Sequence, residues 1–174
     1  MQHKFEYLLH DEVDSMAWAK QLAKVLEKGD VLAFSGELGT GKSVMSRAMM
    51  RALGVQDEAL PSPTYAIIQE YDGMLDGDKD CRIAHMDLYR LESIEDADML
   101  GIREFFEGSW ICLIEWAERA QALLPTSVLH IELSYVQGDV KKRHLCLSGV
   151  TAEKYATSIG NSWSFSKKDS DKSV

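Results

Sequence analysis

The chain of 174 residues lacks an apolar run long enough to cross a membrane, and its first residues, MQHKFEYLLHDE, contain no signal-peptide core. We therefore expect a cytoplasmic protein without membrane contact. The length is that of a single domain able to bury most of its apolar surface, and the sequence shows neither an internal repeat nor a second core. We expect one domain over residues 1–155 and a polar, flexible tail over residues 156–174.

Basic residues are also scarce, since 19 Lys and Arg stand against 28 Asp and Glu, which gives a net charge of −9. A protein that binds nucleic acid by itself usually carries a basic excess, so we expect any link to nucleic acid to run through a partner. Cysteines are few and far apart, at Cys81, Cys112 and Cys146. Their spacing favours buried thiols over a disulfide or a zinc site.

Short apolar runs alternate with helical patterns along the chain, which is typical of an α/β sheet. The two apolar runs near the C-terminus flank a QGD turn and predict an antiparallel hairpin. The expected strands are 4–10, 30–36, 66–72, 81–87, 110–116, 127–136 and 142–150, and the expected helical segments are 11–28, 43–54 and 93–106.

The most specific pattern is GELGTGKS at residues 36–43, which fits the phosphate-loop pattern GxxxxGK[ST] without a mismatch. It follows an apolar strand and opens a helix, the context in which backbone N–H groups and a helix N-terminus bind phosphate. Lys42 is expected to contact the β- and γ-phosphates, and Ser43 to offer its hydroxyl to Mg²⁺. We predict a three-layer α/β domain similar to P-loop NTPases, with a mixed, mainly parallel central sheet and a C-terminal antiparallel hairpin.

Two later strands each end in an acid, Asp87 after RIAHM and Glu115 after ICLI. Ligands of α/β folds bind at this edge of the sheet, so one carboxylate could hold Mg²⁺ while the other orients or deprotonates an attacking water. These local patterns alone do not assign the two roles. The segment PSPTY at residues 61–65 could place Thr64 as a sensor of the γ-phosphate.

Taken in order, SGELGTGKS, PSPTY, HMDLYRL, LGIREFF and ICLIEW resemble the TsaE (YjeE) family of small bacterial P-loop ATPases, over about residues 5–148. The phosphate loop occurs in many ATPases, whereas HxDLYRL followed by an apolar strand and EW is much more specific. The resemblance implies a protein that binds ATP and Mg²⁺, hydrolyses ATP slowly alone and acts with the TsaB–TsaD pair. That assembly transfers a threonylcarbamoyl group onto the adenosine beside the anticodon of tRNAs reading ANN codons, so contact with tRNA is indirect.

The resemblance also implies roles for individual residues. Ser43 and Glu115 are the expected Mg²⁺ ligands, and Asp87 is the residue expected to be needed for hydrolysis. Together with Lys42 of the phosphate loop and Thr64 of the switch-like segment, Asp87 forms the expected catalytic group. The residues expected to bind the nucleotide are Glu12, Glu37, Leu38, Gly39, Thr40, Gly41, Lys42, Ser43, Val44 and Trp116.

The sequence departs from the family at two places. Ala117 stands where the family has a proline after the tryptophan, which indicates a less rigid loop. The C-terminal hairpin reads QGDVKKR where the family often has a GR step near the nucleotide, so Lys141 or Arg143 could replace that arginine. Neither change touches the residues expected to bind phosphate or metal.

Three other functions are consistent with a phosphate loop. A small-molecule kinase would usually need an arginine-rich lid, and only Arg90 and Arg103 lie between Asp87 and Glu115. A GTPase would need a guanine-reading NKxD motif, which the sequence does not contain. A nucleotide sensor would control partner docking by ATP occupancy without needing hydrolysis.

Overall fold

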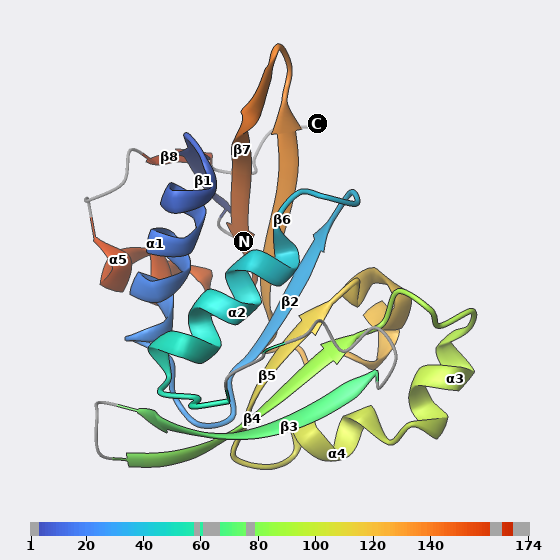
Figure 1. Ribbon diagram of the computed structural model, residues 1–174. Helices are drawn as coiled ribbons and strands as arrows, with labels where there is room; N and C mark the ends of the chain where they lie inside the picture. Colours follow the sequence, from blue (N-terminus) through green and yellow to red (C-terminus); the bar gives the residue numbers. More distant parts are fainter. Residues whose placement is uncertain (1–3, 58–59, 61–66, 76–78, 161–164, 169–174) are drawn as a thin grey trace.

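The structure is a computed structural model, shown in Figure 1, and it describes residues 4–57, 60, 67–75, 79–160 and 165–168. Those residues form one eight-stranded sheet in the order β3-β4-β5-β2-β6-β7-β1-β8. Within them, no helix combines the length and the apolar composition that crossing a membrane would require. The strands are β1 (Lys4–Leu9), β2 (Val31–Gly36), β3 (Ile68–Leu75), β4 (Lys79–Asp87), β5 (Trp110–Glu115), β6 (Leu129–Val136), β7 (Asp139–Ser148) and β8 (Phe165–Lys168).

The centre of the sheet is parallel and its flanks are antiparallel. Strands β4, β5, β2 and β6 run parallel to one another. The pairs β3–β4, β6–β7, β7–β1 and β1–β8 are antiparallel. The expected α/β fold with a mixed sheet and a C-terminal hairpin, β6–β7, is confirmed, and parallel pairing is limited to the four central strands.

Helices cover both faces of the sheet, so the domain has three layers (Figure 1). In β2, Leu32 and Phe34 belong to one apolar core, while Val31 and Ala33 belong to the other. This alternation is the signature of a strand buried on both faces. The first core includes residues of α1 (Glu12–Ala23), α2 (Lys42–Ala52) and α5 (Ala152–Ile159), and the second includes residues of α3 (Ile94–Met99), α4 (Ile102–Phe106) and the 3₁₀ segment η1 (Ala117–Leu123).

Several elements differ in length from the sequence prediction. Helix α1 ends at Ala23 and not near Lys28, because the N–H groups of Val25 and Leu26 bond back three residues and tighten the chain into a turn. Strand β3 continues to Leu75, three residues beyond the expected end of that strand at residue 72. The expected domain boundary after residue 155 lies inside α5, whose Tyr155, Ala156 and Ile159 are buried.

The first helix begins as its sequence predicts. Asp11 is the N-cap of α1, and its side chain accepts a hydrogen bond from the N–H of Asp14. Trp18 and Leu22 then pack into the core, so α1 lies firmly against the sheet. This places its N-terminal turn beside the phosphate loop.

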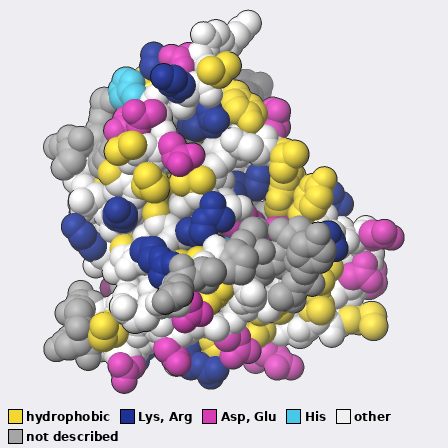
Figure 2. All heavy atoms as spheres, in the orientation of Figure 1, with side chains coloured by type: hydrophobic (Ala, Val, Ile, Leu, Met, Phe, Trp, Pro, Cys, Tyr) yellow, Lys and Arg dark blue, Asp and Glu magenta, His cyan; other side chains and the backbone are white. Residues whose placement is uncertain are grey.

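The three cysteines carry free thiols, and the expectation that all three are buried is wrong for one of them. Cys81 and Cys112 are buried, whereas Cys146 is partly accessible. On the face shown in Figure 2, acidic side chains lie along the lower and right-hand edges and also at the top and upper left, and Lys and Arg side chains lie among them, both near the centre and at the edges.

Candidate functional site

The glycine-rich loop connects the end of β2 to the start of α2. Gly36, Gly39 and Gly41 have φ angles of 131°, 80° and 106°, a region that L side chains rarely adopt. At Gly36, an added Cβ would also lie 2.2 Å from the carbonyl oxygen of Leu133 in the neighbouring β6. The first glycine of the pattern is therefore required both for the backbone turn and for the close approach of the loop to the sheet.

Lys42 is the first residue of α2, and its side chain folds back over the loop. It is buried, and its Nζ donates to the carbonyl oxygens of Gly36 at 2.7 Å and Glu37 at 2.9 Å. The same Nζ lies 3.8 Å from the centroid of the Trp116 ring. Burial lowers the pKa of Lys42, and the nearby carboxylates, Glu118 first, oppose that shift. The ammonium group is thus held at the mouth of the loop by fixed partners.

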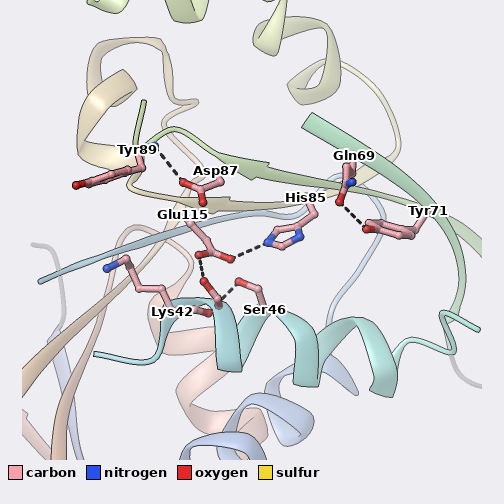
Figure 3. Close-up of polar contacts among 9 residues, drawn as sticks. Lys42, Ser46, Gln69, Tyr71, His85, Asp87, Tyr89 and Glu115 are labelled. Atoms are coloured by element: carbon pink, nitrogen blue, oxygen red, sulfur yellow. Dashed lines mark hydrogen bonds and ion pairs between the residues drawn. The ribbon is translucent and has the colours of Figure 1, made fainter. Parts of the chain in front are cut away.

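A chain of hydrogen bonds joins α2 to two strands of the sheet (Figure 3). The hydroxyl of Ser43 donates to Oε2 of Glu115, at the end of β5. The other carboxylate oxygen of Glu115 bonds to Nε2 of His85 in β4 at 2.7 Å. His85 and Glu115 are both buried. The carboxylate of Glu115 is therefore held from both sides, and one of its oxygens is directed at the first turn of α2.

Asp87 lies beside Glu115 because the two are register partners in the parallel pair β4–β5. Its side chain is buried, and its Oδ1 accepts a hydrogen bond from the N–H of Tyr89 at 3.0 Å. Figure 3 shows both carboxylates directed from the ends of their strands toward the start of α2, where Lys42 lies. The two strand-end acids and the phosphate loop, distant in the sequence, thus meet at one edge of the sheet.

Trp116 follows Glu115 directly and forms a wall of the same region. Its backbone has a positive φ of 58°, which turns the chain sharply after β5. Its ring lies 4.9 Å from the ring of Tyr89, measured between centroids, and under the ammonium group of Lys42. The structure thus places this tryptophan, which we expect to bind the nucleotide, beside the phosphate loop.

A cavity of about 580 Å³ opens over the loop. This volume lies within the range of about 300–1,000 Å³ that is usual for small-molecule sites. Residues at the start of α1 and in the β6–β7 hairpin complete its walls. The lining residues are Asp11, Glu12, Val13, Ser15, Leu38, Gly39, Thr40, Gly41, Lys42, Ser43, Val44, Trp116, Lys141 and Arg143.

Asp87 and Glu115, although expected at the site, are not among the residues that line this cavity. Glu37 does not line it, and contributes its carbonyl oxygen to Lys42. Thr64 lies outside the described residues. The remaining residues expected to bind the nucleotide, from Glu12 to Trp116, all belong to the lining.

The residues present fit a phosphate chain with a magnesium ion. Backbone N–H groups of a glycine-rich loop and of a helix N-terminus favour phosphate oxygens. A hydroxyl and a carboxylate in contact, such as those of Ser43 and Glu115, offer the hard oxygen ligands that Mg²⁺ prefers. Among the described residues, no group of three or more His, Cys, Asp or Glu is placed to hold a metal ion.

Sequence reasoning missed two sets of contacts. His85 stands two residues before Asp87, but nothing in the local pattern shows that it reaches Glu115 across the strand pair. Tyr135 and Arg143 of the hairpin contact the phosphate loop itself, through the carbonyl oxygens of Leu38, Gly39 and Thr40. In the sequence, the basic run KKR at residues 141–143 indicated that the hairpin takes part in the site. It indicated a contact with the nucleotide, however, and not with the phosphate loop.

Comparison with known proteins gives one consistent family. The sequence pattern of the family described as "Threonylcarbamoyl adenosine biosynthesis protein TsaE" matches residues 9–145. The chain is 35% identical to the tRNA threonylcarbamoyladenosine biosynthesis protein TsaE of Haemophilus influenzae, over 72% of this chain and 78% of that protein. It is also 35% identical to the protein of the same name from Bacillus subtilis, over 74% of this chain and 77% of that protein.

A solved structure agrees with the sequence comparisons. The crystal structure of YdiB from Bacillus subtilis superposes with a TM-score of 0.74 and 27% sequence identity. The match covers 91% of this chain and 95% of that chain. The similarity therefore extends over nearly the whole of both chains.

Proposed function

This chain belongs to the family described as Threonylcarbamoyl adenosine biosynthesis protein TsaE, and we propose that it serves that modification of tRNA as a Mg²⁺-dependent ATPase. One observation carries the proposal above all. Ser43, Glu115 and Asp87 converge on the end of a phosphate loop whose lysine is already in place. That combination of a cation, a hydroxyl and two carboxylates is the one that nucleoside triphosphate hydrolysis needs.

Each group of the site has a defined part in this chemistry. The loop backbone and Lys42 bind and orient the β- and γ-phosphates, and the cavity over the loop takes the nucleoside, with Glu12 toward the base. Ser43 and Glu115 hold Mg²⁺, which when bound neutralises the charge that develops on the phosphate oxygens. The expected role of Thr64, as a sensor of the γ-phosphate, belongs to the same proposal.

Asp87 is the residue that distinguishes hydrolysis from binding. It lies next to Glu115 as its register partner, a position from which it can orient the attacking water and accept its proton. Water adds to the γ-phosphorus, the bond to the β,γ-bridging oxygen breaks, and ADP and phosphate leave. The rings of Trp116 and Tyr89 pack against each other beside the site and reduce its access to bulk water.

The partners follow from the family and from the charge of the chain. We propose that the TsaB–TsaD pair binds this protein, stimulates its ATPase and carries the transfer of the threonylcarbamoyl group to the adenosine beside the anticodon. The net charge of −9 favours indirect contact with tRNA, through that pair.

The test is the rate of ATP hydrolysis with and without the purified TsaB–TsaD pair, together with tRNA modification in the same mixture. Asp87→Ala should bind ATP like the wild type while losing both stimulated hydrolysis and modification. Asp98→Ala is the control, because it removes an exposed aspartate that pairs with Arg103 away from the site. Full modification by Asp87→Ala would show that ATP occupancy suffices, and a rate that depends on a small hydroxyl compound would show a kinase.

A further inference from the structure

The outer side of the phosphate loop rests against the β6–β7 hairpin. The hydroxyl of Tyr135 donates to the carbonyl oxygen of Leu38 at 2.8 Å. Arg143 donates through Nη2 to Gly39 at 3.3 Å and through Nε to Thr40 at 3.2 Å, in each case to the carbonyl oxygen. Three successive carbonyl groups of the loop are thus held by two side chains.

These two side chains form a unit of their own. Tyr135 and Arg143 face each other as register partners across the hairpin. The guanidinium carbon of Arg143 lies 4.5 Å from the centroid of the Tyr135 ring, a distance at which a cation and an aromatic face attract. The ring therefore fixes the plane of the guanidinium group that contacts the loop.

The remaining donors of Arg143 are used within the hairpin. Its Nη1 donates to the carbonyl oxygens of Val140 and Lys142, each at 2.8 Å. With the two bonds to the loop, four of the five N–H donors of a guanidinium group reach backbone carbonyls. Arg143 lines the cavity, yet its hydrogen-bonding capacity is directed at the protein backbone.

Holding the carbonyls on one side sets the direction of the N–H groups on the other. A trans peptide is planar, and its N–H points opposite to its C=O. The bonds to Leu38 and Thr40 therefore turn the N–H groups of Gly39 and Gly41 away from the hairpin. Within the described part of the chain, neither N–H has an acceptor, whereas the N–H of Thr40 makes a long bond of 3.3 Å to Glu37.

We propose that Tyr135 and Arg143 are positioning residues that hold the phosphate loop in its anion-binding form before the nucleotide arrives. This inference rests on the proposed binding of a triphosphate at the loop, and it adds that the affinity depends on a clamp, the pair Tyr135 and Arg143, which contacts the loop backbone and not the ligand. The clamp acts on the phosphate chain, because two of the carbonyls that it holds, those of Leu38 and Thr40, belong to peptides whose N–H groups face that chain. The adenine end of the cavity, at the start of α1, is not part of it.

Two variants separate this role from a direct contact of the arginine with phosphate. Arg143→Lys keeps the positive charge but cannot reach several carbonyls at once, and Arg143→Gln loses the charge. If Arg143 acts on the backbone, both variants should bind inorganic triphosphate and ATP about tenfold more weakly than the wild type, by an equal factor for the two ligands. Tyr135→Phe, which removes one hydrogen bond from an exposed side chain, should weaken both ligands about threefold.

The second measurement needs no nucleotide. The ¹⁵N relaxation of the free, full-length protein reports the order of the amides of Gly39, Thr40 and Gly41, which should become more mobile in Arg143→Gln and Tyr135→Phe. Lys142→Gln is the matched control, because it removes the neighbouring charge, which pairs with Asp139 and does not touch the loop. Equal melting temperatures show that the variants keep the fold.

The outcomes are distinct. Wild-type affinity for triphosphate in Arg143→Lys, with loss in Arg143→Gln, would show that the charge contacts the ligand and would overturn the clamp. Unchanged relaxation of the loop amides in both hairpin variants would overturn it as well. If the wild type bound no triphosphate, the proposed function would fail, while the relaxation data would still decide whether the hairpin orders the loop.

Discussion

His85 and Glu115 are joined by a hydrogen bond of 2.7 Å, and their side chains are 0% and 1% exposed. A carboxylate accepts hydrogen bonds, so Nε2 of His85 carries the donated proton. Nδ1 has no hydrogen-bond partner among the residues that the structure describes. A buried polar atom without a partner costs about 1–3 kcal/mol, which indicates that this histidine is kept for what it does to Glu115.

His85→Asn should lower the affinity of the site for Mg²⁺, so that ATP binding requires a higher Mg²⁺ concentration. His85→Gln should keep the requirement close to that of the wild type. The amide nitrogen of glutamine reaches the position of Nε2, but that of asparagine reaches only the position of Nδ1. Loss of a group that orients a metal ligand typically costs tenfold or more in metal affinity. Calorimetric titration of ATP at several Mg²⁺ concentrations measures the effect. Equal Mg²⁺ requirements for the wild type and both variants would contradict it.

Lys42→Ala should weaken ATP binding by about 10- to 100-fold, because a hydrogen bond to a charged group contributes about 1.5–3 kcal/mol. The dissociation constant, measured directly and not through the ATPase rate, is the readout. Lys142→Ala removes a charge of the same kind from the hairpin and should bind ATP normally. An unchanged dissociation constant for Lys42→Ala would reject its role at the phosphates.

Gly36→Ala and Gly138→Ala compare two glycines with positive φ in different surroundings. A Cβ at residue 36 would meet the carbonyl oxygen of Leu133 at 2.2 Å, whereas a Cβ at residue 138 would meet nothing within 4 Å. Gly138→Ala should therefore lower the free energy of unfolding by about 1 kcal/mol, from backbone strain alone. Gly36→Ala should lower it by about 2–4 kcal/mol, because the sheet must also move. Urea denaturation gives both values. Equal losses would show that β6 can move away from the added Cβ without a further loss in the free energy of unfolding.

The stability of the protein should fall in mildly acidic solution, partly because of His130. Burial between strands lowers the pKa of this histidine below its ordinary value of about 6.5. The unfolded chain then takes up the proton first as the pH falls, so the contribution of neutral His130 is complete above about pH 6.5 and decreases below it.

Thermal unfolding of the wild type and of His130→Gln between pH 5 and 8 isolates this contribution. As the pH falls, the melting temperature of His130→Gln should rise relative to that of the wild type. A difference that does not vary with pH would show that His130 titrates alike in the folded and unfolded chains.

Local patterns were sufficient for the phosphate loop and for the central strands. The strand before Gly36 and the helix after Lys42 are each determined by residues close together in the sequence. The strand–loop–helix unit could therefore be predicted without knowledge of the fold. Asp87 and Glu115 could also be placed at the same edge, because both follow parallel strands. Their pairing in register is a consequence of strand alignment, which the sequence does not display.

Contacts between distant segments were beyond that reasoning. The bond from His85 to Glu115 spans 30 residues, and the bonds from the hairpin to the loop span about one hundred. Strand β8 pairs with β1, although its polar composition predicted a loose tail. In each case the tertiary alignment of two segments, and not a local propensity, determines the structure.

The alignment of Asp87 with Glu115 also limits how the chain can change in length. Because successive side chains of a strand point to opposite faces, inserting or deleting one residue within β4 or β5 would turn one carboxylate toward the other layer of helices. The connection over residues 88–109, which carries α3 and α4, lies outside this register. Relatives could lengthen or shorten that crossover and acquire new surfaces there, whereas the two strands must keep their residue count.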